Sequence, residues 1–232
     1  FGVFVFGPLM GGGFGFGVRQ FNSPRAMASS DGGLNIYILD AENRRVVRLT
    51  NSLKWIDQFQ IDNEPGGKVI GELTGIAVNS QKEIFISDPR NLRIIKFTQE
   101  GRFLGEIKGR SEFIEPGEIV IDKDDYLYAA GMDGKGIYLF DNLGNYIKKY
   151  SSDNRESIGS IGVNGSYFYY HDIESSKVRV LSKKLLPLFD INIPAESEKK
   201  IPYAQIASGL KDRIWILDIN NNRIYGYDPV KR

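Results

Sequence analysis

The stretch "DPRNLRI" at 88–94 recurs along the chain and decides the fold. It aligns without gaps with "DAENRRV" at 40–46 and "DINNNRI" at 218–224: each has Asp, then Asn three residues later, Arg five later, and Val or Ile six later. Two weaker copies, "DIESSKV" at 172–178 and "GMDGKGI" at 131–137, keep the final β-branched residue. The five final residues are spaced by 48, 43, 41 and 46 residues, near the ~40–45 residues of one four-stranded propeller blade.

Short apolar runs flank these copies and predict β-strands. "NIYILD" ends at Asp40 and "RVVRLT" begins at Arg45, and similar runs surround the copies at 88–94, 172–178 and 218–224. Such runs, rich in Ile, Val, Tyr and Phe and bounded by Asn, Asp, Gly and Ser, are typical of strands and turns. A run with more small residues precedes each pair, and a more polar run follows four of them. The sequence therefore predicts an all-β propeller of five four-stranded antiparallel blades, with a six-bladed ring as the alternative.

The conserved chemistry of the repeat has a structural interpretation. Asp and Asn side chains accept hydrogen bonds from nearby backbone N–H groups and fix turns, and an Arg two residues beyond the Asn can return to the Asp carboxylate. We therefore interpret the repeated polar residues as turn stabilisers rather than as a catalytic site. They are Asp40, Asn43, Arg45, Asp88, Asn91, Arg93, Asp172, Asp218, Asn221 and Arg223.

Two longer stretches resemble the NHL repeat. "FNSPRAMASSDGGLNIYILDAENRRVVRLT" at 21–50 has Phe-x-x-Pro, a small-residue strand, an apolar strand ending in Asp, and then Asn and Arg before the next strand. Residues 73–107 are similar, and the resemblance extends more weakly through 21–232. It implies a β-propeller, and it implies a protein-interaction platform more often than an enzyme.

Composition limits the chemistry that the chain offers. The 232 residues include no cysteine and one histidine, His171, which excludes thiolate catalysis and any site that needs two imidazoles within one chain. Hydrophobic residues make up 41% and charged residues 25%, as in ordinary globular proteins. We expect a single propeller domain over residues 1–232, with no cofactor and no metal.

These observations favour a non-catalytic scaffold or recognition module that binds a protein partner. The first alternative is a calcium-dependent, lactonase-like enzyme, because related propellers hold a channel cation with Glu, Asn and Asp; Glu118, Asn164 and Asp212 are candidates, although their spacing does not select them.

The second alternative is an RNA-binding module. Basic residues recur in the first two repeats, namely Arg44, Arg45, Arg48, Arg90, Arg93 and Lys96. The formal net charge of +1 disfavours a protein that binds nucleic acid through phosphate neutralisation, and we interpret these residues as charges on strand edges.

The uncharged opening stretch, "FGVFVFGPLMGGGFGFGV" at 1–18, calls for a separate interpretation. Its seven glycines argue against a transmembrane helix, and no basic segment precedes it as in an export signal. The fifth repeat has no outer-strand run of its own, so we expect Phe1, Val3, Phe4, Val5 and Phe6 to form a closing strand against residues 223–228. The rest of the arm, to residue 20, would be a loop.

Two further expectations concern the surroundings of the chain. The apolar arm could instead dock onto a partner chain or a lipid surface. The lack of an initiator Met, the lack of cysteine and the NHL resemblance favour an extracytoplasmic location, in the periplasm, outside the cell or at its surface.

Overall fold

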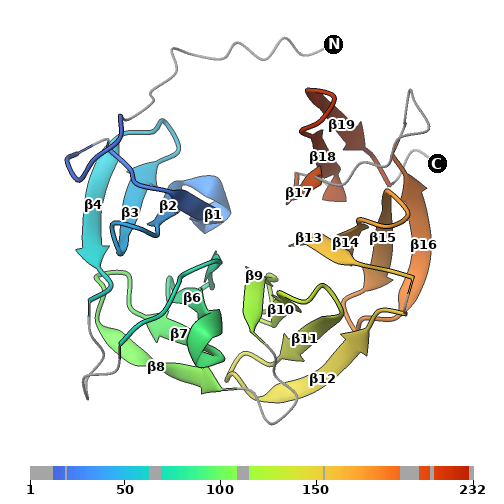
Figure 1. The fold of residues 1–232 in the computed structure, drawn as a ribbon, viewed down its shortest axis with the longest axis horizontal. Helices are drawn as coiled ribbons and strands as arrows, with labels where there is room; N and C mark the ends of the chain where they lie inside the picture. The colour runs from blue at the N-terminus through green and yellow to red at the C-terminus, as the bar shows by residue number, and fades with distance from the viewer. Residues whose placement is uncertain are drawn as a thin grey trace.

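The computed structural model describes residues 13–18, 20–62, 69–108, 115–153, 155–193, 204–209 and 212–229. Five antiparallel sheets stand around a common centre, which confirms the predicted five-bladed β-propeller (Figure 1). The helices in these ranges are the short 3-10 turns η1 (Asp31–Gly33) and η2 (Pro89–Asn91). Among the described residues, no helix is long and apolar enough to cross a membrane.

The strands follow one another from the centre of the ring to its rim, in the same order in every blade. Blade 1 contains β1 (Pro24–Ser30), β2 (Asn35–Asp40), β3 (Arg45–Thr50) and β4 (Trp55–Gln60). Blade 2 contains β5 (Ile76–Val78), β6 (Ile84–Asp88), β7 (Arg93–Phe97) and β8 (Phe103–Lys108). Blade 3 contains β9 (Pro116–Ile121), β10 (Leu127–Gly131), β11 (Gly136–Phe140) and β12 (Tyr146–Ser151). Blade 4 contains β13 (Ile158–Val163), β14 (Tyr167–Asp172), β15 (Lys177–Ser182) and β16 (Pro187–Asn192). Blade 5 contains β17 (Ala204–Ser208), β18 (Ile214–Asp218) and β19 (Arg223–Tyr227).

The hydrophobic core lies between neighbouring blades. Alternate side chains of each strand point to opposite faces of its sheet, so each blade has one face toward the preceding blade and one toward the following blade. Tyr37 and Val46 of blade 1, for example, pack on Ile76 and Ile86 of blade 2, and three similar clusters join blades 2 to 3, 3 to 4 and 4 to 5. Because both faces of the middle blades are covered, β10 and β11 are buried along their whole length.

A buried aspartate joins three segments of blade 2. Asp88 Oδ1 accepts from the backbone N–H of Gly71 (3.1 Å), which precedes the inner strand β5. Asp88 Oδ2 accepts from Asn91 Nδ2 in the turn (2.8 Å) and from Arg93 Nε on β7 (2.9 Å). Asp88 is 0% exposed and Arg93 is 1% exposed, so the ion pair is shielded from water. We call this arrangement the aspartate clamp.

Blade 1 repeats the aspartate clamp with the predicted residues. Asp40 accepts from the backbone N–H of Asn22 (2.7 Å), from Asn43 Nδ2 (2.7 Å) and from Arg45 Nε (2.7 Å). Asp40, Asn43 and Arg45 thus form a second aspartate clamp.

The other three blades modify the clamp. In blade 4, Ser175 donates to Asp172 in place of Asn, and the arginine partner is Arg179 rather than Lys177, which stands at the position that repeat alignment selects. In blade 5, Asn221 Nδ2 donates to Asp218 Oδ2 (2.7 Å), but Arg223 is exposed where Arg45 and Arg93 are buried.

Blade 3 has glycine, Gly131, at the aspartate position, and a side-chain carboxylate from the turn, Asp133 Oδ1, accepts the Lys135 N–H instead (3.0 Å).

The same turn also places a residue other than glycine in the left-handed backbone region. Arg44 (φ 50°), Leu92 (φ 54°), Ser176 (φ 55°) and Asn222 (φ 52°) each stand four residues after the clamp aspartate. Side chains adopt this region at a cost, because Cβ approaches the following carbonyl oxygen. The turns of blades 1, 2, 4 and 5 therefore share this backbone conformation.

The predicted closing strand, Phe1–Phe6, lies outside the described residues. The described part of blade 5 has three strands, whereas each of the other blades has four. The first described segment, from residue 13, is held on blade 1: Asn43 Nδ2 donates to the Gly15 carbonyl (2.8 Å) and Arg45 NH1 donates to the Phe16 carbonyl (2.8 Å).

Replacing Asp88 with alanine tests the aspartate clamp. Asp88→Ala removes one carboxylate from the buried Arg93 guanidinium, which still pairs with Glu106 (2.8 Å), and removing one partner of a buried ion pair typically costs about 3–5 kcal/mol. We expect a loss near 3 kcal/mol in the free energy of unfolding, measured by urea denaturation. Asp57→Ala, which removes the exposed partner of Arg48, is the matched control and should cost less than about 1 kcal/mol. Equal effects of the two substitutions would contradict the role of the clamp.

Candidate functional site

A cavity of about 350 Å³ opens at the rim of the propeller, between blades 3 and 4. Its apolar wall comes from the β15–β16 hairpin and includes Leu188 and Phe189, and its polar wall includes Tyr150, Glu156 and Arg179. Leu188 is 52% exposed, so the entrance carries an apolar side chain that is open to solvent. Ligand sites in proteins typically combine such apolar walls with a few fixed polar groups.

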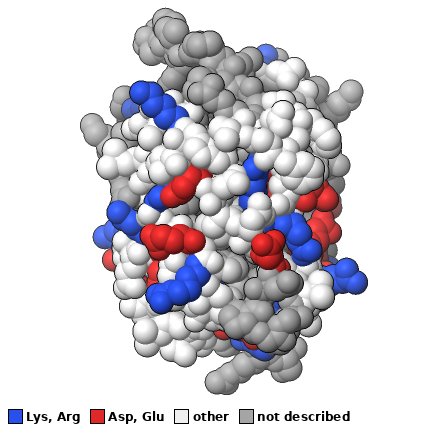
Figure 2. Space-filling view, turned by 90° about the vertical axis from the view of Figure 1, so that its left-hand side faces the viewer, with Lys and Arg blue, Asp and Glu red and all other residues white. Residues whose placement is uncertain are grey.

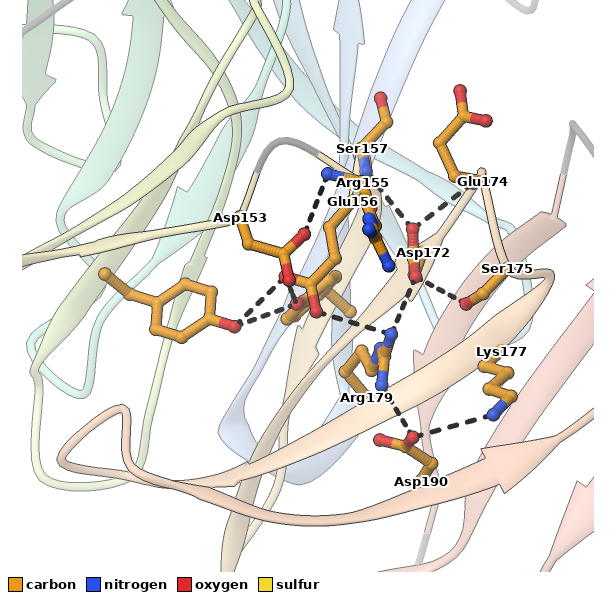
Figure 3. Close-up of polar contacts among 12 residues, drawn as sticks. Asp153, Arg155, Glu156, Ser157, Asp172, Glu174, Ser175, Lys177, Arg179 and Asp190 are labelled. Atoms are coloured by element: carbon orange, nitrogen blue, oxygen red, sulfur yellow. Dashed lines mark hydrogen bonds and ion pairs between the residues drawn. The ribbon is translucent and has the colours of Figure 1, made fainter.

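Arg179 on β15 is the centre of the polar wall (Figure 3). Its NH2 atom lies 3.2 Å from Asp172 Oδ2 and 3.3 Å from Glu156 Oε1, and its NH1 atom lies 2.6 Å from Asp190 Oδ2. These carboxylates come from the end of β14, from the connection between β12 and β13, and from β16. The rim cluster, which we define as Arg179 with these three carboxylates, therefore fixes three segments around one guanidinium.

The charges of the rim cluster reinforce one another. Burial on its own would lower the pKa of Arg179, but its interactions with Asp190, Glu156 and Asp172 outweigh burial and raise that pKa. Burial likewise opposes ionisation of Asp172, but the hydrogen bonds from Ser175, from the Ser157 backbone and from Arg179 lower its pKa overall. The Nε atom of Arg179 is buried and has no hydrogen-bond partner among the described residues. The cluster is thus a fixed ion network whose one unpaired donor is buried.

Two tyrosines extend this network: Tyr150 lines the cavity, and Tyr170 is buried outside the lining. Tyr170 donates to Glu156 Oε2 (3.1 Å), and the Tyr150 hydroxyl lies 3.1 Å from the Tyr170 hydroxyl. Burial raises the pKa of both phenols. They remain protonated near neutral pH, so this wall offers hydrogen-bond donors and acceptors rather than a base that removes protons.

Glu118 occupies a different environment, on the inner strand of blade 3. Its carboxylate accepts from the Ile161 N–H (3.0 Å) and the Ser160 hydroxyl (3.3 Å) of blade 4, and Ser160 Oγ accepts from the Ile206 N–H (3.2 Å) of blade 5. Although solvent reaches the side chain, the surrounding blades displace most of its water, and this burial raises the pKa of Glu118 to about 7 against the two hydrogen bonds. Glu118 and Ser160 together therefore link three successive blades.

The structure brings together two of the three residues considered for a calcium-dependent enzyme. Asn164 Nδ2 donates to the Asp212 carbonyl (3.0 Å) and Ser166 Oγ donates to Asp212 Oδ2 (2.6 Å), whereas Glu118 lies on β9 and bonds to β13. The same turn-to-turn contact joins blades 2 and 3, where Ser80 Oγ donates to Asp125 Oδ2 (2.6 Å). This repetition indicates an inter-blade contact. Within the described ranges, no group of three or more His, Asp or Glu side chains is placed to hold a metal ion.

The basic residues of the first two repeats are largely engaged within the protein. Arg45 and Arg93 are buried in aspartate clamps, Arg48 pairs with Asp57, and Lys96 lies 2.7 Å from Glu83. Figure 2, which faces the side of the ring formed by blades 1 and 2, shows blue and red side chains interspersed rather than a continuous basic surface.

His171, the one histidine, is 1% exposed on β14, and its Nε2 atom has no hydrogen-bond partner among the described residues. Burial lowers its pKa although Asp172 and Asp218 oppose this, so the imidazole is neutral near pH 7. It packs within the blade 4–blade 5 interface.

The raised pKa of Glu118 predicts a pH dependence of stability. Between the ordinary glutamate pKa of 4.5 and about 7, the folded protein binds more protons than the unfolded chain, so stability falls as the pH rises through this window. Because the side chain is exposed to solvent, we expect a loss of only about 1 kcal/mol. Urea denaturation at pH 5, 6, 7 and 8 measures it.

Glu118→Gln, whose amide oxygen still accepts from Ile161, should abolish this part of the pH dependence. His171→Gln is the control. The lowered pKa of His171 makes stability rise with pH, so removing this histidine should leave the fall in stability between pH 6.5 and 7.5 in place. If Glu118→Gln and the wild-type protein give the same pH profile, Glu118 is ionised in the folded state at pH 5.

The proteins that this chain resembles share its fold at low sequence identity. No protein-family model and no curated protein matches the sequence. One similar solved structure is a catalytically inactive virginiamycin B lyase from Staphylococcus aureus with quinupristin (TM-score 0.64, 15% identity, covering 90% of this chain and 71% of that chain). A second is a streptogramin B lyase (TM-score 0.62, 16% identity, covering 90% of this chain and 83% of that chain). A third is a nidogen/laminin complex (TM-score 0.65, 16% identity, covering 90% of this chain and 81% of that chain). The chain thus shares its β-propeller architecture with lyases and with a propeller in a protein complex.

Proposed function

We propose that the chain is a non-catalytic recognition module of the NHL type, and that the rim cavity between blades 3 and 4 binds a segment of a partner protein. The observation that carries this proposal is the rim cluster, in which three carboxylates are paired with Arg179 beside an apolar wall. One guanidinium and three carboxylates give this fixed network a net negative charge, and it positions a ligand through hydrogen bonds. Its ion-paired carboxylates and protonated tyrosines favour binding over proton transfer.

The cavity favours a ligand with an apolar side chain next to a hydrogen-bond acceptor. Leu188 at the entrance is 52% exposed, which makes it available for apolar contact. The Tyr150 hydroxyl, which lines the cavity, is a donor for a backbone carbonyl. An extended peptide segment supplies both groups with the spacing of one residue, and we infer that such a segment is the ligand.

Two alternative functions stay as predictions from the sequence. The calcium-dependent enzyme would rely on Glu118, whose pKa near 7 suits acid–base chemistry, and calorimetric titration with calcium tests it. RNA binding would require basic residues beyond those paired within the blades, and its salt dependence tests it. We further propose an extracytoplasmic location, supported by the lack of cysteine and by the NHL resemblance; fractionation of the native source tests it.

The rim cavity can be tested by replacing its exposed apolar residue. Leu188→Asp places a charge beside Asp190 at the entrance, and we expect at least a tenfold loss of partner binding, because a buried unpaired charge costs more than about 1.4 kcal/mol. The partner is first identified by photo-crosslinking in the native source from a photoreactive residue at position 188. Binding is then measured with the purified proteins.

Leu143→Asp is the matched control, because Leu143 is 82% exposed in the β11–β12 turn, outside the cavity lining. It should leave binding unchanged. The proposal fails if both substitutions weaken binding equally, or if the crosslinked partner binds Leu188→Asp as tightly as the wild-type protein.

A further inference from the structure

The ring has two end blades, and each presents a face that is buried elsewhere in the molecule. The inner strands pack in the sequence β1 on β5, β5 on β9, β9 on β13 and β13 on β17. In the described ranges this packing is not repeated between β17 and β1, and Figure 1 shows blades 1 and 5 on either side of an opening. We call the side of a blade that meets the next blade its forward face, and the opposite side its backward face.

The forward face of blade 5 is exposed and apolar. The β-branched residue that ends each repeat motif belongs to this face: Val46, Ile94, Ile137 and Val178 are 0–1% exposed, but Ile224 is 61% exposed. Leu217, the residue before Asp218, is 36% exposed, whereas the residues at the same position in blades 1 to 4 are at most 4% exposed. Leu217 and Ile224 are apolar like the residues of the buried interfaces, but no described residue packs over them to the same extent.

The inner strand of blade 1 is exposed on its backward face, whereas Val47, farther out on the same face, is 0% exposed. Met27 on β1 pairs with the residue two positions before Asp40. The residues that stand at this position of the inner strand in blades 2 to 5 are Ile76, Ile119, Ile161 and Ile206. Those four isoleucines are 1–7% exposed, whereas Met27 is 72% exposed. Both walls of the opening are therefore apolar surfaces of the kind that form the core.

A polar feature of the forward face points to a bound polypeptide backbone. Glu118 of blade 3 accepts the Ile161 N–H of blade 4, and Ser160 of blade 4 accepts the Ile206 N–H of blade 5. Gln205 stands at the equivalent position of blade 5 and is exposed toward the opening. Its amide can accept an N–H from a further strand, as its two counterparts do.

We propose that the opening between blades 5 and 1 is the docking site of this chain's own N-terminal segment, residues 1–12. The segment begins at the right place, because Gly13 is tied to blade 1: the Phe21 N–H donates to the Gly13 carbonyl (3.0 Å), and Asn43 and Arg45 hold residues 15 and 16. Twelve residues reach roughly 40 Å when extended. The segment "FGVFVFGPLMGG" is uncharged and matches the apolar walls at Met27, Leu217 and Ile224.

A second copy of the chain fits the opening less well. A blade that packs on blade 5 in the manner of the other four interfaces continues the ring. If one blade of a second copy packed on blade 5 in this way, the other four blades of that copy would continue the ring. They would overlap blade 1 of the first copy (Figure 1). A short segment of the same chain avoids this overlap.

Engineered cysteines test the docking directly, because the natural chain contains no cysteine. The pair Val5→Cys with Leu217→Cys is compared under mild oxidation with the pair Val5→Cys with Leu143→Cys, in which the second thiol lies on blade 3. Docking predicts about tenfold more intramolecular disulfide in the first pair, reflecting its higher effective concentration, as read by mass spectrometry. Equal yields would overturn the proposal, and disulfides formed mainly between copies would assign the opening to a second chain instead.

A thermal-stability cycle provides a second measurement. Deleting residues 1–12 should lower the Tm, and Ile224→Lys should lower the Tm of the full chain by about 2–4 °C but have little effect after the deletion, because the contact is already lost. Leu143→Lys is the matched control and should act equally in both backgrounds. An Ile224→Lys shift of the same size with and without residues 1–12 would show that the segment does not cover this face.

Discussion

A buried carboxylate with three partners determines how each clamped blade is built. Asp40 and Asp88 each bind the backbone that enters the inner strand, the amide of the turn and the guanidinium of the third strand. Moving such a charge out of water is costly, so the aspartate stabilises the fold only because each of these partners is in place. The clamp thereby fixes the turn between the second and third strands against the start of the first strand of the same blade.

The packing of blade on blade explains why the clamp can vary. Blade 3 has Gly131 at the aspartate position, yet β10 and β11 are completely buried between blades 2 and 4. Apolar contact on both faces therefore holds blade 3 in the ring without that carboxylate. At the end of the ring, blade 5 retains Asp218 and Asn221 but exposes Arg223, and the forward side of its sheet is also open. Local polar bonds and inter-blade burial thus contribute in different proportions around the ring.

The sequence predicted those parts of the structure that depend on local pattern. The alternation of apolar runs and Asp-x-x-Asn-x-Arg turns identified the strands, and the roles of Asp40 and Asp88 followed from the chemistry of turns. The rim cluster was missed because Arg179 stands seven residues after Asp172, not five. The available signal was its cross-strand position opposite Asp190, which becomes visible only when the register of β15 and β16 is known. The environment of Glu118 depends on how blade 3 meets blade 4, and no local pattern contains that information.

The left-handed residue in the turns has a consequence for how this protein could adapt to heat. Four turns hold Arg44, Leu92, Ser176 or Asn222 in a conformation that suits glycine or asparagine, and only blade 5 has asparagine there. A side chain with Cβ in this region costs about 1 kcal/mol or more relative to glycine. Leu92 is 49% exposed, so little packing depends on it. The chain therefore holds a reserve of thermostability in its turns that selection could draw on without altering the core or the rim cavity.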